Sequence, residues 1–111
     1  MPLDQFTPLL RNPHLKPAEK VVALELLYRY FAPKARHTAG GLMLITISGK
    51  HGIAHYVGLE GQAVGTAITR LAATGILDRE ERHPKDVHGR PVTKLYVSFP
   101  QPQEETLRSL A

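Results

Sequence analysis

Apolar residues recur at helical spacing in two short runs near the middle of the chain, separated by Gly58. The first run is Ile53, Ala54, Val57 and Leu59, and the second is Val64, Ala67, Ile68 and Leu71. This spacing predicts two amphipathic helices. Gly58 and Gly75 are predicted to end them, because glycine tolerates left-handed backbone. An ordinary helical hairpin in a packed core would show the same pattern.

The period changes from Ile76 onward. Residues 76–84 and 92–99 fit two strands, the second with Val92, Leu95, Val97 and Phe99 among β-favouring neighbours, and Asp86, Gly89 and Pro91 between them favour a turn. A third β-like run occupies residues 42–47. The predicted order is therefore helix, strand, helix, helix, strand, strand, with a hairpin tip that carries basic residues and histidine.

Residues 16–99 resemble the winged helix-turn-helix family of DNA-binding domains, above all MarR-type repressors and small winged-helix modules of plasmid and phage regulators. The resemblance is carried by the helix pair and by the exit Thr74-Gly75-Ile76-Leu77-Asp78-Arg79. It implies an α+β fold, with a three-helix core and a small antiparallel β-sheet wing. It also implies binding of double-stranded DNA. The chain departs from the family where the reading helix begins, because Glu60, Gly61, Gln62 and Ala63 stand there and only Gln62 is an obvious base reader.

The resemblance implies roles for the polar residues of the second helix, which we expect over residues 62–70. Gln62 is the candidate for adenine, Thr66 and Thr69 for phosphate or a thymine methyl group, and Arg70 for guanine or phosphate. Phosphate contacts are expected from Lys50, Lys85 and Arg90, with a narrow minor groove as a second location for Arg90. His51 is expected at the start of its helix beside a phosphate. The expected DNA-binding residues are Lys50, His51, Gln62, Thr66, Thr69, Arg70, Lys85, His88 and Arg90.

The charge distribution agrees with such a division of roles. The chain has 111 residues, a formal net charge of +4 and a sequence pI near 9.6. Residues 41–78 carry as many acidic as basic residues, so the excess lies in residues 1–40 and 79–100. We expect those two segments to contact DNA phosphates while the neutral helix over residues 62–70 enters the major groove. A mild basic excess that serves only solubility is the alternative.

A homodimer is predicted from the apolar character of residues 17–31. This expected helix is apolar on nearly every side, apart from an i, i+4 pair of Glu25 and Arg29. A second subunit is the simplest cover for it. Residues 1–15 are expected to form an extended N-terminal arm that packs on this helix, in the dimer or within one chain with equal weight. Residues 16–100 form the predicted domain, and residues 101–111 a tail.

Several functional classes are excluded at this level. The chain has no cysteine, and we find no nucleophile and base arrangement or phosphate-binding glycine loop, so no enzyme activity and no cofactor are expected. His51 and His55 would share a helix face, but two ligands do not make a metal site. We expect a cytoplasmic protein, with neither a secretory signal nor a membrane-spanning segment.

A dimeric transcriptional repressor is the leading expectation. The alternatives are a DNA-binding adaptor for plasmid or phage segregation or replication, and a winged-helix module that binds another protein. The last would use the aromatic residues Phe6, Tyr28, Tyr30 and Phe31.

Overall fold

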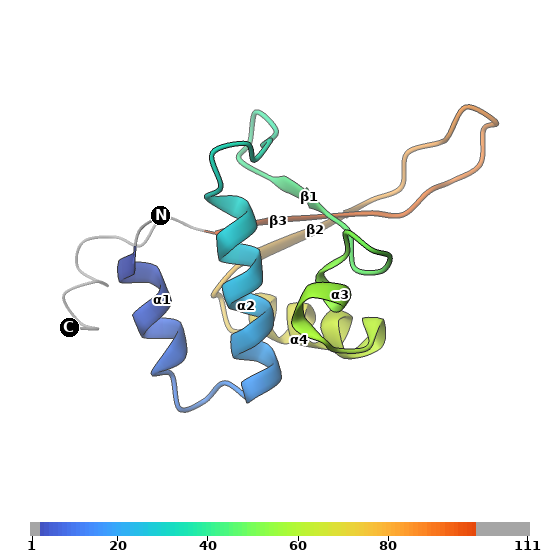
Figure 1. Cartoon of the computed structure of the whole chain (residues 1–111). Helices are drawn as coiled ribbons and strands as arrows, with labels where there is room; N and C mark the ends of the chain where they lie inside the picture. Colours follow the sequence, from blue (N-terminus) through green and yellow to red (C-terminus); the bar gives the residue numbers. More distant parts are fainter. Residues whose placement is uncertain (1–2, 100–111) are drawn as a thin grey trace.

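The computed structural model describes residues 3–99, with side chains from residue 7 onward. Within this range the chain is α+β, as predicted, with four helices and a small antiparallel sheet (Figure 1). The elements in chain order are α1 (Leu3–Leu10), α2 (Pro17–Tyr30), β1 (Met43–Ile45), α3 (Ile53–Val57), α4 (Gly61–Ala73), β2 (Asp78–Arg82) and β3 (Lys94–Ser98).

The sheet has the strand order β1-β3-β2, so β3 lies in the centre. Met43 pairs with Val97 on one side of β3, and Arg79 pairs with the same residue on the other side. Met43, Ile45 and Val97 are buried, whereas every residue of β2 is exposed. A fully charged edge strand such as β2 resists pairing with the edges of other sheets. The β2–β3 hairpin extends away from the helices (Figure 1).

The core forms where α4 packs against α2. The predicted apolar stripe of α4, Val64, Ala67, Ile68 and Leu71, is buried, and α2 contributes Val22, Ala23, Leu26 and Leu27. Burial of each large aliphatic side chain stabilises the fold by about 1.5–3 kcal/mol relative to exposure. The orientation of α4 is therefore fixed by its stripe, and its other face is left for solvent.

Glycine ends both helices of the central pair, as predicted. Gly58 caps α3 with φ 72°, and Gly75 follows α4 with φ 80°. Both values lie in the left-handed region that side chains with a Cβ rarely adopt. The sharp turn at Gly58 separates the short α3 from α4 and lets the two helices lie against each other.

The N-terminal segment differs from its prediction, because residues 3–10 form the helix α1 and not an extended arm. Pro8 lies inside this helix, where it removes one backbone hydrogen bond without preventing the turn. Leu9 is 8% exposed and joins the core, and the Lys20 Nζ donates to the Leu10 carbonyl at 2.8 Å. The segment thus packs on α2 of its own chain and adds a fourth helix to the three predicted.

Other predictions on this scale are confirmed with shifted boundaries. The helix expected over residues 17–31 ends at Tyr30, and the helix expected over residues 62–70 extends from Gly61 to Ala73. The Arg29 Nε lies 2.9 Å from the Glu25 Oε1, which confirms the i, i+4 pair. The predicted tail, residues 101–111, lies outside the described residues.

Candidate nucleic-acid interface

The outer face of α4 carries three of the predicted DNA-binding residues together. Gln62, Thr66 and Thr69 follow one another at helical spacing, and all three are exposed. They lie there because the buried stripe of α4 turns the opposite face to solvent. The result is a short polar surface without a net charge of its own.

The Thr69 hydroxyl is already hydrogen-bonded within α4, which leaves only one of its two expected DNA contacts. The hydroxyl donates a hydrogen bond to the Gly65 carbonyl at 3.0 Å, one turn earlier in α4. A phosphate oxygen needs a donor, and this donor is already engaged within the helix. The exposed Thr69 methyl group is the part that suits a thymine methyl group.

Arg70 lies on the side of this face nearest to α2. Its Nε is 3.2 Å from the Oε2 of Glu19, whose side chain is 4% exposed, whereas the Arg70 side chain is 55% exposed. The Glu19 Oε1 accepts the backbone N–H of Lys16 at 3.2 Å. Glu19 was not predicted as a functional residue from the sequence. The signal that the sequence offers is the start of a helix, because Pro17 suits the first helical position and glutamate is favoured in the first turn.

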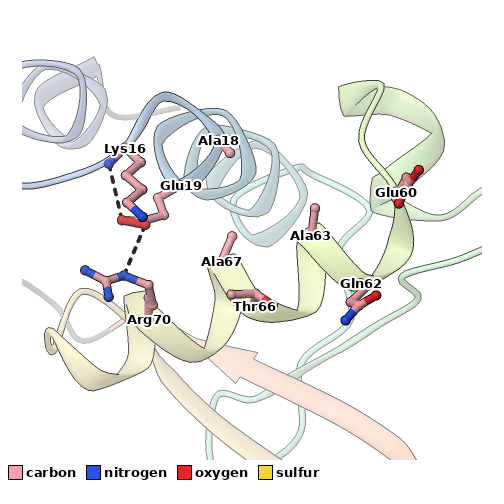
Figure 2. Close-up of a pocket in the computed structure, with 9 residues that line it drawn as sticks. All are labelled: Lys16, Ala18, Glu19, Glu60, Gln62, Ala63, Thr66, Ala67 and Arg70. Atoms are coloured by element: carbon pink, nitrogen blue, oxygen red, sulfur yellow. Dashed lines mark hydrogen bonds and ion pairs between the residues drawn. The ribbon is translucent and has the colours of Figure 1, made fainter.

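A shallow groove of about 410 Å³ runs between the start of α2 and the outer face of α4. Figure 2 shows Glu19 and Arg70 at one end and Glu60 and Gln62 at the other. Small side chains, Ala18, Ala63 and Ala67, line the middle. The groove carries carboxylates as well as cations, so its charge is close to balanced.

The tip of the β2–β3 hairpin has a defined turn. The Asp86 Oδ1 accepts hydrogen bonds from the backbone N–H groups of His88 at 2.8 Å and Arg90 at 2.9 Å, and Gly89 adopts φ 75°. Lys85, His88 and Arg90 are exposed there, as predicted. Val87, at the apex, is 95% exposed.

The basic residues of the hairpin fall into two groups. At its base, Arg79 pairs with Glu81, and the Arg82 Nε lies 2.6 Å from the Glu80 Oε2. Among the described side chains, no salt bridge involves Lys85, Arg90 or Lys94, which is exposed at the start of β3. The positive charge of the hairpin that has no carboxylate partner therefore lies at the tip and at the start of β3.

Lys50 and His51 lie in the connection between β1 and α3, and both are exposed. The prediction that His51 begins the helix is wrong, because α3 starts at Ile53 after Gly52, whose backbone is extended at φ −77° and ψ 158°. The N–H groups of Ile53 and Ala54 donate to the carbonyls of Thr46 and Ile47. His51 therefore shares no helix face with His55 and has no helix end to support an anion contact.

Comparison with protein-family models, with curated proteins and with solved structures found no match to this chain. None of the helices in the described part is long and apolar enough to cross a membrane. The described residues also contain no group of three histidine or acidic side chains placed to hold a metal ion.

Proposed function

We propose that this protein binds double-stranded DNA as a winged helix-turn-helix protein, with α3 and α4 as the helix pair and the β2–β3 hairpin as the wing. The observation that carries the proposal is the exposed polar face of α4, held outward by a fully buried stripe. An α-helix with its side chains is roughly 10–12 Å in diameter, so α4 can lie in the major groove of B-DNA, which is about 12 Å wide.

The division of charge supports the same docking. Lys85 and Arg90 stand at the hairpin tip without a carboxylate partner among the described residues, while α4 is nearly neutral. Phosphate contacts fix the position of a protein on the duplex, and base contacts supply the specificity. In this proposal the hairpin tip and Lys50 contact the phosphates of the DNA backbone. Gln62 reads adenine, with Thr66 and Thr69 beside it.

We further propose that two copies associate through α2 and α1 and act as a transcriptional regulator, most simply a repressor. Val21 and Tyr28 on α2 and Leu10 on α1 remain 43%, 59% and 52% exposed, although α1 covers part of α2. A second subunit would bury these side chains. A two-fold dimer places two reading helices about one DNA turn, roughly 34 Å, apart.

A role in plasmid or phage segregation or replication would use the same DNA contacts. It would differ from a repressor in binding cooperatively to tandem repeats.

A protein-interaction module is favoured by one observation, the neutrality of α4. Its predicted aromatic surface is only partly available, because Tyr30 and Phe31 pack against the core while Tyr28 is exposed. Phe6, the fourth residue of that predicted surface, lies before residue 7, where the described side chains begin.

Fluorescence anisotropy over a salt series tests the proposal. The full chain is titrated on the DNA upstream of its own gene and on a random duplex of equal length. We expect tight, steeply salt-dependent binding to the upstream DNA and weaker binding to the random duplex. Absence of binding to both at low salt would contradict the proposal and favour a protein partner.

A further inference from the structure

Among the described residues, Glu19 is the one charged residue that is buried, with 3% of the whole residue exposed. Its two carboxylate oxygens have separate partners: one accepts the Lys16 N–H, and the other lies 3.2 Å from the Arg70 Nε (Figure 2). A buried carboxylate is tolerated only when it is paired in this way. Arg70 therefore supplies the compensating charge for a residue of α2.

This pairing limits where the Arg70 guanidinium can lie. Glu19 is held by its burial and by the Lys16 N–H, whereas the Arg70 side chain is mostly exposed, so the carboxylate determines the position of the guanidinium. Figure 2 shows Arg70 directed toward the start of α2 and away from Gln62. Because the ion pair is made through Nε, the two Nη groups are left to bind an outside partner.

We propose that Glu19 is a positioning residue that holds Arg70 at the α2 side of α4, where Arg70 binds a backbone phosphate and does not read a base. The inference rests on the DNA-binding function proposed above and assigns one of the two roles left open for Arg70. Arg70 stands in the last turn of α4, whereas base contacts come mainly from the N-terminal part of a reading helix. The free Nη groups suit the oxygens of a phosphate.

The experiment compares full-length Arg70→Ala, Glu19→Gln and the double variant with wild type. Each is titrated by anisotropy on a duplex selected by wild type from a random library, on single-base variants of it, and on a random duplex. Lys34→Ala is the matched control, because it removes one exposed cation beyond the opposite end of α2, a helix roughly 20 Å long, where the proposed docking places no phosphate contact. Circular dichroism melts confirm that each variant is folded at the assay temperature.

We expect Arg70→Ala to weaken binding to all duplexes by the same factor, about tenfold, and to lower the salt slope by about 0.9, the value of one phosphate contact. In the Glu19→Gln background, Arg70→Ala should cause a loss of affinity about threefold smaller than in wild type, because Glu19 no longer holds the guanidinium. Lys34→Ala should leave the slope unchanged. Should Arg70→Ala fail to fold, Arg70→Lys replaces it. Lysine keeps the charge but cannot hold Glu19 and a phosphate together, so we expect a smaller loss of the same kind.

Three outcomes would overturn the inference while leaving DNA binding intact. Arg70→Ala alters the preference at one base pair, it leaves the salt slope unchanged, or its effect is the same with and without Glu19→Gln. The first makes Arg70 a base reader, and the others make the ion pair purely structural. If wild type binds none of the duplexes, the proposed function itself fails, a result that wild type alone reveals.

Discussion

Asp86 and Arg90 are joined by two hydrogen bonds at the tip of the β2–β3 hairpin, one to the Asp86 side chain and one between their backbones. The Asp86 Oδ1 accepts the Arg90 N–H at 2.9 Å, and the Asp86 N–H donates to the Arg90 carbonyl at 2.8 Å. The same carboxylate oxygen accepts the His88 N–H. A fully exposed tip thus has a fixed shape, and Lys85 and Arg90 are presented from it in a defined arrangement.

Replacing Asp86 with alanine should loosen this tip without unfolding the domain. Each hydrogen bond of this kind contributes about 0.5–1.5 kcal/mol, and the tip contributes no side chain to the core. We expect the His88 and Arg90 amides to exchange with solvent several-fold faster, as measured by NMR. Asp86→Asn is the control, because asparagine keeps an acceptor oxygen and should retain most of the protection. Equal exchange in the alanine variant and wild type would contradict this description of the tip.

Three glycines offer a graded test of the backbone. Gly58→Ala should lower the free energy of unfolding by about 1–2 kcal/mol, because φ is 72° there although nothing obstructs a Cβ. Gly65→Ala, in mid-helix with open space, should raise it by about 0.5–1 kcal/mol. At Gly52 a Cβ would collide with the Ile47 carbonyl oxygen, so Gly52→Ala should lose the most. Urea denaturation measures all three, and an unchanged Gly58→Ala would mean that α3 does not end in a left-handed turn.

Gln62 and Arg90 should give different signatures in DNA binding. Gln62→Ala should relax the preference at one base pair, at about 1–3 kcal/mol, because its amide is the candidate for adenine. Arg90→Ala should weaken binding to all sequences alike and reduce the salt slope by about 1, because its proposed contact is with phosphate. Anisotropy on single-base duplex variants separates the two effects. If both variants bind as wild type does, the docking described here is wrong.

The dimer has its own test. Sedimentation equilibrium at micromolar concentration should give twice the chain mass of 12.3 kDa. Val21→Glu, on the exposed side of α2, should give a folded monomer. Leu44→Glu is the control, because Leu44 is 49% exposed on β1, outside the proposed interface. This variant should remain dimeric. A wild-type monomer, or equal effects of the two variants, would count against association through α1 and α2.

The parts of the fold that sequence predicted are those governed by local rules. The helical spacing of Val64, Ala67, Ile68 and Leu71 determines which face of α4 is buried, and Gly58 and Gly75 adopt the positive φ that stops a helix. The extended arm predicted for residues 1–15 is wrong; that prediction rests on Pro2, Pro8 and Pro13, because proline favours extended backbone and helix ends. The apolar residues of this segment fit a helix, which one internal proline does not prevent.

The candidate site was less predictable, because its geometry depends on contacts between distant parts of the chain. The three polar residues of α4 share a face by periodicity alone. The position of Arg70 depends on Glu19, which lies on another helix, and the burial of Glu19 depends in turn on how α2 packs on α4. His51 was misplaced because the bonds from Ile53 and Ala54 to the Thr46 and Ile47 carbonyls start α3 two residues later than expected.

In the proposed docking, α4 and the β2–β3 hairpin form one DNA-binding surface. This surface can be tested by titrating a ¹⁵N-labelled chain with duplex DNA and following the amide chemical shifts. We expect the largest shifts at Gln62, Thr66, His88 and Arg90, with little change at Val21 on α2. A duplex that binds while shifting only α1 and α2, or that shifts nothing at low salt, would contradict this docking.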